Sequence, residues 1–371
     1  MTNTGTHYSV IGVMSGTSLD GADIALCRFS IDSDKWAYDI VQAETISYPA
    51  HWKQILSNLE KTDALTFQQT HVDYGFYLGK LVSDFIKKYD LKPDFVSSHG
   101  HTIFHQPQKR LTVQIGAGSA IAAECGLPVV CDFRSLDVAL GGQGAPLVPI
   151  GDKLLFSEFD FCLNLGGFAN VSYEYNMERI AYDICPVNIV MNAVCEALGK
   201  EYDSEGELAR HGFINDDLLQ ELNGLPFYKL PLDCPKSLGK EWVIKNVNNL
   251  LEKHNLKEID VLRTFCEHIA VQTAKVLNNK FKGKILFTGG GAYNTFLIEI
   301  MKKHIIHQIT IPDRKTIEFK EALIFAFLGV LRMRKEVNCL KSVTGAVYDN
   351  IGGAVYEAPP NFQNSHGAII P

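Results

Sequence analysis

The sequence predicts an α/β protein built from two related domains. At 371 residues the chain is longer than a single hydrophobic core usually supports. A pattern of strand, polar glycine turn and strand opens the chain at residues 8–29, and the same pattern recurs at 159–175. Helical and strand patterns alternate after each of these hairpins. The repetition indicates two α/β domains that face each other.

The opening hairpin joins strands at 8–14 and 22–29 through the turn SGTSLDG. Two strands around a polar glycine turn differ from the strand-to-helix step of a Walker loop or a dinucleotide-binding fold. Apolar residues then recur at helical spacing from Leu65 to Tyr89, and a Lys-Pro pair follows. A short strand, FVSS, leads to His99. The strand PVVCDF then carries the chain into the glycine-rich segment ALGGQGAPLVP, where we expect it to leave the first domain.

In the second half, the hairpin FDFCLNLGGFANVSYEY is followed by YDICPVN, which reads as a strand end entering a helix at 188–198. A helix is expected at 262–279, followed by the strand KILFTGGGA, a helix from Asn294, the strand HQITIP and the helix KEALIFAFLGVLRMRKE. We expect one domain at residues 1–140 with a return at about 340–371, and the other at 141–339.

Composition limits the kinds of partner. Hydrophobic residues make up 46% and charged residues 21%, which is typical of a globular protein, and the formal net charge is −7. Such a balance provides no basic surface for nucleic acid or anionic membrane, so any phosphate must be bound locally. Nine cysteines without a CxxC pair favour reduced thiols. With neither a signal-peptide pattern nor a membrane-length apolar run, we expect a cytoplasmic protein.

Three glycine-rich turns are candidate phosphate sites. They are SGTSLDGAD at 15–23, NLGGFAN at 164–170 and FTGGGAYN at 287–294. Backbone amides in such turns bind anions, and an aspartate beside phosphates usually acts through Mg²⁺. Each turn could equally be an ordinary loop, since glycine, serine and aspartate are turn residues anyway. Together the three form a moderately specific pattern for a clamp around a triphosphate.

Asp183 is the candidate general base. It lies at a strand end three residues before Pro186, which suits the first turn of the next helix. A helix N-terminus would keep the carboxylate ionised and able to accept a proton. The alternative is an N-capping aspartate without a chemical role.

Two further clusters could bind a ligand. SSHGHTIFHQP contains His99, His101 and His105, for which hydrogen bonding to a sugar or phosphate is favoured over a metal site, since zinc would need further ligands. FRSLDVALGGQGAP places Arg134 near Asp137 in a glycine-rich context. Its guanidinium could fork onto a carboxylate or phosphate, or form an internal salt bridge.

In combination these segments resemble the anhydro-N-acetylmuramic acid kinase family. The matching stretches run in order from residue 12 to residue 353, and GVMSGTSLDG and DFR…GGQGAPLVP are the most distinctive. The resemblance implies two actin-like (ribonuclease H-like) domains with a nucleotide-binding cleft between them. It also implies a reaction that opens the 1,6-anhydro ring with water and transfers the ATP γ-phosphoryl group to O6. A homodimer is a further expectation from the family.

The resemblance and the turns together assign the site residues. Asp183 would be the catalytic base, and Asp20 and Glu321 would hold Mg²⁺ through water. The residues expected to bind ATP are Gly16, Thr17, Ser18, Leu19, Asp20, Gly21, Ala22, Asp23, Asn164, Gly166, Gly167, Gly289, Gly290 and Gly291. The residues expected to bind the sugar are His99, His105, Asp132, Arg134, Gln143 and Asn188.

The chain departs from the family pattern beside the proposed base. Where the family commonly has D-T-G-P-G-N, this chain has Asp183-Ile-Cys-Pro-Val-Asn188, so Cys185 and Val187 replace glycines. It also has His101 in place of the usual Gln and Phe168 in place of Ile. We expect a changed pocket shape with retained activity. Two alternatives stay open: a kinase of the same fold with another sugar or an acyl substrate, and an ATP-gated binding module that transfers no phosphate.

Overall fold

The computed structural model describes residues 6–16, 19–231 and 236–358. The chain divides into two compact units, which are described separately: unit 1 comprises residues 1–155 and 319–371, and unit 2 comprises residues 156–318. The sequence placed the domain boundaries at residue 140 and at about residue 340. In the structure, the first boundary follows residue 155 and the second precedes residue 319. The difference arises because helix α5 (Val148–Leu155) and most of helix α13 (Arg314–Arg334) belong to unit 1. Helix α13 departs from helical geometry at Phe319, where the second boundary falls.

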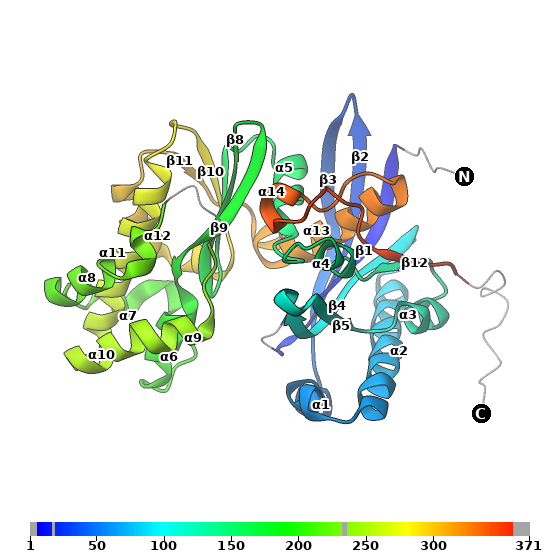
Figure 1. The fold of residues 1–371 in the computed structure, drawn as a ribbon, viewed down its shortest axis with the longest axis horizontal. Helices are drawn as coiled ribbons and strands as arrows, with labels where there is room; N and C mark the ends of the chain where they lie inside the picture. The colour runs from blue at the N-terminus through cyan, green and yellow to red at the C-terminus, as the bar shows by residue number, and fades with distance from the viewer. Residues whose placement is uncertain (1–5, 17–18, 232–235, 359–371) are drawn as a thin grey trace. The chain divides into compact units, whose positions relative to one another are not determined.

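Unit 1 contains a mixed sheet in the order β12-β6-β4-β1-β2-β3, and β5 pairs with β4 (Figure 1). Strands β1, β2 and β3 form an antiparallel meander, whereas β4 and β6 run parallel to β1. The strands are β1 His7–Ser15, β2 Gly21–Asp32, β3 Lys35–Ser47, β4 Phe95–Gln106, β5 Leu111–Ile115, β6 Val129–Cys131 and β12 Ala354–Tyr356. The helices besides α5 and α13 are α1 Ala50–Asn58, α2 Ala64–Tyr89, α3 Gly118–Cys125, α4 Ser135–Ala139 and α14 Lys341–Thr344.

Unit 2 contains a second sheet in the order β11-β10-β7-β8-β9. Strands β7, β8 and β9 are antiparallel, and β10 runs parallel to both β7 and β11. The strands are β7 Phe161–Leu165, β8 Phe168–Tyr175, β9 Glu178–Pro186, β10 Lys284–Thr288 and β11 Gln308–Thr310. The helices are α6 Asn188–Glu196, α7 Glu207–Arg210, α8 Asp216–Asn223, α9 Lys240–Val243, α10 Asn249–His254, α11 Glu258–Leu277 and α12 Thr295–His304.

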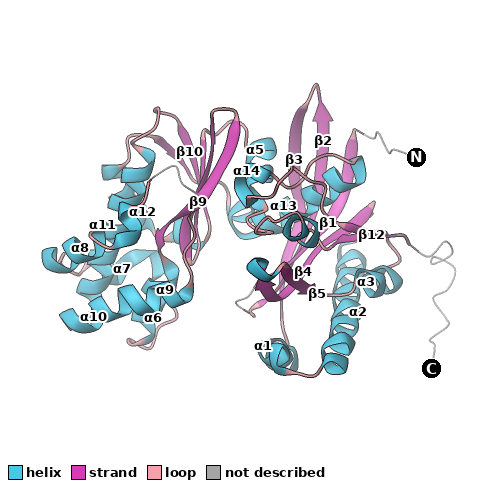
Figure 2. Cartoon of the chain, viewed as in Figure 1, coloured by secondary structure: helices cyan, strands magenta, loops and turns pink. Residues whose placement is uncertain are grey.

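The two sheets share one topology. Five strands of each sheet can be numbered in chain order: β1, β2, β3, β4 and β6 in unit 1, and β7 to β11 in unit 2. With this numbering both sheets have the order 3-2-1-4-5, in which an antiparallel meander is followed by parallel crossovers. Figure 2 shows helices packed beside the strands of each unit. This repeated arrangement is the ribonuclease H-like topology of actin-like proteins, so the predicted fold class is confirmed. The sequence did not predict β3, because this edge strand has a weak hydrophobic pattern and Ile40 is its one buried residue.

Local sequence explains how the larger elements form. Helix α2 begins after Asp63, whose side chain accepts hydrogen bonds from the amides of Leu65 and Thr66. It ends at Tyr89, and Asp90 adopts a left-handed conformation before the Lys-Pro pair. In unit 2, helix α11 is buried along much of its length and contacts α6, α7, α8, α12 and β9. Among the residues described, no helix combines the length and apolar character needed to cross a membrane.

Helix α13 packs directly against the central strand of unit 1. Its residues from Ala322 to Leu328 are at most 2% exposed. A Cβ atom added to Gly12 of β1 would overlap the carbonyl oxygen of Ala322. Glycine is therefore required at position 12 for the helix to approach the strand this closely.

We expect Gly12→Ala to destabilise the protein by about 1–3 kcal/mol, because the helix must shift away from β1. Urea unfolding followed by circular dichroism measures this change. Gly167→Ala is the control, since Gly167 is not among the glycines with positive φ and its added Cβ would meet its nearest neighbour, the Ile189 Cβ, at 3.9 Å. Equal stability of the Gly12→Ala variant and wild type would contradict the packing argument.

Candidate active site

The first glycine turn joins β1 to β2, as predicted. Ser15 ends β1 and pairs with Ala22, so the two strands stay paired up to the turn. Leu19 has a φ of 59°, and a Cβ on Gly21 would overlap the carbonyl oxygen of Ile46. Thr17 and Ser18, two of the expected ATP-binding residues, lie outside the described residues. Gly16, between them and Ser15, is half-buried.

Acidic side chains flank this turn. Asp20 is exposed, whereas Asp23 accepts a hydrogen bond from the Thr45 hydroxyl at 2.6 Å. Desolvation and the charge of Asp23 raise the pKa of Glu321, while Arg134 opposes the rise. Glu321 therefore lies close enough to Asp23 for their charges to interact. The Ala22 side chain lies in the hydrophobic core, so contact with a nucleotide at this position is restricted to the backbone.

A buried polar cluster supports the start of the turn. The Ser15 hydroxyl lies 2.8 Å from His101 Nδ1 and accepts hydrogen bonds from Tyr48 at 2.6 Å and Tyr74 at 3.0 Å. Burial lowers the pKa of His101 to about 4, so the ring is neutral. His101 therefore belongs to the support of the turn. Within the described ranges, no group of three or more His, Cys, Asp or Glu side chains could hold a metal ion.

His99 and Arg134 form the centre of the expected sugar site. His99 Nδ1 lies 2.9 Å from the Gly100 carbonyl oxygen, which can only accept, so Nδ1 carries the proton. His99 Nε2 then accepts from Arg134 Nε at 3.0 Å. Burial and the Arg134 charge lower the pKa of His99 well below its usual value, which keeps the ring neutral. Arg134 also donates to the Gly144 carbonyl oxygen at 2.6 Å.

The remaining sugar candidates of unit 1 occupy different settings. Asp132 is exposed and accepts from the Ser135 hydroxyl at 2.5 Å. His105 is also exposed, and its Nδ1 lies 3.1 Å from the Thr112 hydroxyl. The Gln143 amide donates to the Thr344 carbonyl oxygen at 2.8 Å. The contact between Gln143 and Thr344 joins the glycine-rich loop ALGGQGAPLVP to the C-terminal part of unit 1.

In unit 2, the turn at Gly166 and Gly167 caps the N-terminus of helix α6. The Gly167 carbonyl oxygen accepts from the amides of Val187 at 2.8 Å and Ile189 at 3.3 Å, and the Gly166 carbonyl oxygen accepts from Asn188 at 3.2 Å. These bonds satisfy the free amides of the helix N-terminus. Asn164 pairs with Thr288 of β10, so the turn lies beside the third glycine segment.

The three glycines after β10 have different roles. Gly289 has a φ of 81°, and an added Cβ would lie 2.6 Å from the Asn164 side chain. Gly291 would meet the Leu165 side chain at 2.8 Å. These two glycines let the backbone pack against β7. A Cβ on Gly290 would meet its nearest neighbour, Asn188 Nδ2, at 3.6 Å, so this position has room.

A cavity of about 700 Å³ opens beside Gly290 and Gly291. Its size is in the range of small-molecule sites. The residues that line it are Asn188, Met191, Asn192, Tyr202, Asp203, Ser204, Glu205, Gly290, Gly291, Ala292, Tyr293, Asn294, Thr295 and Arg314. The structure thus groups Asn188, expected at the sugar, with two of the expected ATP-binding glycines.

Asp183 lies within β9, opposite Asn170, and not in the first turn of a helix. The predicted helix-terminal setting is wrong, because α6 begins at Asn188 and the turn carbonyls already cover its amides. Asp183 Oδ2 instead accepts from the Leu238 amide at 2.8 Å. Burial raises the pKa of Asp183, while the Leu238 amide and the Ser237 hydroxyl oppose the rise. The carboxylate is half-buried and more basic than an ordinary aspartate.

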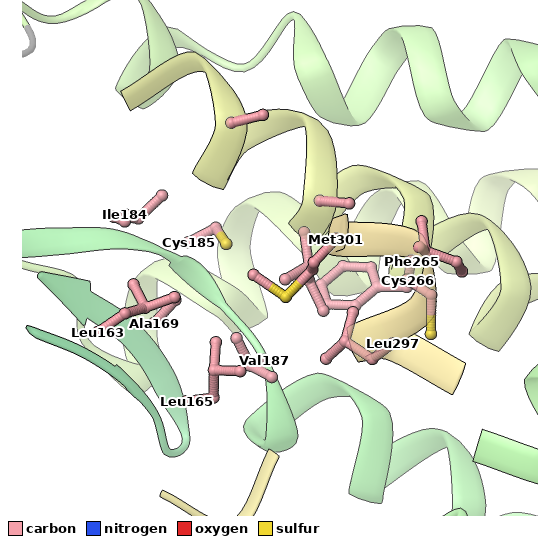
Figure 3. Close-up of a cluster of buried hydrophobic side chains, with 14 of the residues drawn as sticks. Leu163, Leu165, Ala169, Ile184, Cys185, Val187, Phe265, Cys266, Leu297 and Met301 are labelled. Atoms are coloured by element: carbon pink, nitrogen blue, oxygen red, sulfur yellow. The ribbon is translucent and has the colours of Figure 1, made fainter. Parts of the chain in front are cut away.

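Cys185 and Val187 are both fully buried in the hydrophobic core of unit 2. Figure 3 shows them among the labelled hydrophobic side chains of this cluster, which include Leu165 and Met301. Val187 has a φ of −132°, and neither residue is among those with positive φ. Their bulk is accommodated by core packing, so these two side chains do not produce the expected change in pocket shape.

Several site residues escaped the sequence analysis. Ser237 and Leu238, which hold Asp183, lie in a segment whose sequence has no hydrophobic periodicity. The cavity residues at 202–205 and Arg314 carry no local signal. Asn188 and Asn192, one helical turn apart, could have marked the polar face of α6 that lines the cavity.

Comparison with known proteins agrees with these observations. Residues 8–358 match the family described as anhydro-N-acetylmuramic acid kinase. The chain is 36% identical over 368 residues to the anhydro-N-acetylmuramic acid kinase of Pasteurella multocida (strain Pm70), covering 93% of this chain and 96% of that protein. It is 35% identical over 370 residues to the protein of the same name from Francisella tularensis subsp. novicida (strain U112), covering 91% and 95%.

One solved structure similar to the chain is an activator of 2-hydroxyisocaproyl-CoA dehydratase from Clostridium difficile with bound ADPNP, at 12% identity and a TM-score of 0.45. It covers 88% of this chain and 96% of that one. The fold assignment rests on the repeated strand order and not on this distant likeness. By its sequence match over nearly its whole length, the chain belongs to the anhydro-N-acetylmuramic acid kinase family.

Proposed function

We propose that the protein is an ATP-dependent kinase that opens 1,6-anhydro-N-acetylmuramic acid with water and phosphorylates O6, giving N-acetylmuramic acid 6-phosphate in peptidoglycan recycling. Family membership supports the reaction. The observation that carries the chemistry is Asp183: a half-buried carboxylate with a raised pKa, fixed by the Leu238 amide. A carboxylate in this state is suited to accept a proton near neutral pH.

ATP is proposed to bind with its nucleoside in the cavity of unit 2. Gly290 and Gly291 permit close approach of the backbone, and Asn188 and Asn192 offer amide groups. We therefore move Asn188 from the sugar site to the nucleotide site. The β1–β2 turn of unit 1, residues 16–23, is proposed to contact the phosphates through its backbone amides.

Mg²⁺ is proposed to bind through water to Asp20 and Glu321, with Asp23 as a further carboxylate nearby. The donor set fits this ion, since Mg²⁺ keeps several waters and binds one or two carboxylates together with substrate phosphates. Such a site does not need a dedicated cage of protein ligands. When bound, Mg²⁺ would neutralise charge on the phosphates.

The sugar is proposed to bind His99, Arg134 and Gln143, with Asp132 and His105 at the exposed side. Neutral His99 and charged Arg134 are already oriented by their mutual hydrogen bond. The homodimer expected from the family resemblance and the cytoplasmic location expected from the sequence form part of the same proposal.

In the proposed mechanism, Asp183 removes a proton from a water molecule as its oxygen attacks C1. The new O–C1 bond replaces the C1–O6 bond, and the released O6 attacks the γ-phosphorus of ATP. The bond between the γ-phosphorus and the bridging oxygen breaks, and ADP leaves. Asp183 finally returns its proton to solvent. Positioning of the reactants and electrostatic stabilisation of the transferred group would supply most of the rate enhancement, as is usual for phosphoryl transfer.

Mass spectrometry of the product separates this proposal from its alternatives. Incubation with MgATP and the anhydro sugar should add one water and one phosphoryl group. Phosphate gained with an intact ring would indicate an ordinary kinase of this fold. Activity with another sugar or an acyl acceptor alone would point to a different substrate. ATP binding without any phosphorylated product would indicate a binding module and would refute the proposal.

We expect Asp183→Asn to lower kcat by about 10²–10⁴-fold, the usual contribution of a general base. The amide cannot accept the proton but retains the size of the carboxyl group. ATP affinity, measured by calorimetry, should be unchanged, because the cavity residues are untouched. Near-normal turnover in this variant would remove Asp183 from the mechanism.

The pH dependence of kcat/KM tests the state of Asp183. Because burial raises its pKa, the acid limb should lie above the value of about 3.9 typical of a free aspartate. Ser237→Ala removes a hydrogen bond that favours the charged form, so the pKa should rise and the limb should move to higher pH. A limb that moves to lower pH, or stays in place, would show that Asp183 is not the titrating group.

A further inference from the structure

Asp137 is a fully buried carboxylate in helix α4 with no part in the mechanism above. It is 0% exposed and receives hydrogen bonds from two parts of the chain. Its Oδ2 accepts from the Gly144 amide at 2.8 Å. Its Oδ1 accepts from the Asn350 side chain at 2.9 Å, the Thr344 hydroxyl at 2.8 Å and the Cys339 thiol at 3.1 Å. These donors satisfy both oxygens, which makes burial of the carboxylate tolerable.

The glycine-rich loop closes around this carboxylate. A Cβ on Gly142 would overlap Asp137 Oδ2, so the loop could not approach with a larger residue. The Gly142 amide donates to the Asp137 carbonyl oxygen at 2.9 Å, and the neighbouring Gln143 amide donates to Thr344 at 2.8 Å. Gly144 has a φ of 66°, a conformation that favours glycine. The loop therefore has one defined position, set by Asp137 and the C-terminal segment.

Gly144 connects Asp137 to the sugar site. Its amide is held by Asp137, and its carbonyl oxygen accepts from Arg134 at 2.6 Å. Arg134 in turn donates to His99. A continuous chain of hydrogen bonds thus runs from the C-terminal segment through Asp137 and Gly144 to the two central sugar candidates.

We propose that Asp137 is a positioning residue for the sugar site: its carboxylate locks Gly144 between the segment Cys339–Asn350 and Arg134, and thereby fixes the guanidinium against His99. This inference rests on the proposed function for the identity of the sugar. It assigns the C-terminal segment a role in substrate binding, although that segment is about 200 residues away in sequence.

Asp137→Asn tests the proposal because it should change KM for the anhydro sugar without changing KM for ATP. The amide cannot accept hydrogen bonds on both sides, so Gly144 should lose its fixed position. KM for the anhydro sugar should rise about 10- to 100-fold, since a misplacement of about 1 Å can cost about 10²-fold. KM for ATP should stay within about twofold, because the loss concerns sugar binding alone. A purely structural role would change both constants together, or neither.

Asp160→Asn is the matched control. Asp160 also accepts a backbone amide, that of Lys284 at 2.7 Å, and abuts a glycine, Gly283, at the end of β10 away from Gly289. Both Michaelis constants should be unchanged in this variant. Thr344→Val provides a second variant if Asp137→Asn fails to fold. It removes one donor and should raise the sugar KM in the same direction by a smaller factor.

The His99 imidazole gives a readout that does not depend on activity. In wild type, the ¹⁵N resonances of His99, assigned by their absence in His99→Gln, should report a neutral ring with Nε2 accepting a hydrogen bond. Asp137→Asn should shift the Nε2 resonance, and Asp160→Asn should not. If wild type makes no product from the anhydro sugar while this shift occurs, the proposed function fails and the positioning role stands. An unchanged His99 resonance and an unchanged sugar KM in Asp137→Asn would overturn the inference.

Discussion

Parallel strand pairing at the centre of each sheet is the constraint on which the candidate site depends. In unit 1, β1 pairs in parallel with β4, which places Ser15 opposite His101. In unit 2, β7 pairs in parallel with β10, which places Asn164 opposite Thr288, directly before the glycines. Ligands of open α/β sheets bind at the carboxyl ends of their strands. Each sheet therefore has its glycine turn at the carboxyl ends of its central strands, where ligands are proposed to bind.

The sequence predicted those elements whose position follows from a local pattern of residues. Hairpins around glycine turns and the amphipathic pattern of α2 needed no tertiary knowledge, so their positions were predictable. The edge strand β3 was missed because its side chains are mostly half-exposed, and hydrophobic alternation is then weak. The cavity residues at 202–205 were missed because the fold brings them beside Gly290 from a segment with no pattern of its own.

For Asp183, the local argument from the sequence was wrong, although the proposed role of the residue does not depend on it. The family resemblance identified the residue, but the expected helix terminus is occupied by the carbonyls of Gly166 and Gly167. Partial burial instead gives the carboxylate its basicity, and the Leu238 amide gives it an orientation. The neighbouring Cys185 and Val187 point into the core, so substitutions beside a base need not reach the ligand.

In the proposed mechanism, water activated by Asp183 attacks C1, and O6 of the product derives from the anhydro bridge. Reaction in H₂¹⁸O, with immediate borohydride reduction to prevent exchange at C1, reveals the origin of both oxygen atoms. We expect one ¹⁸O at C1 and none in the C6–O–P linkage, as located by fragment mass spectrometry. Label in the bridging oxygen at C6 would refute this mechanism.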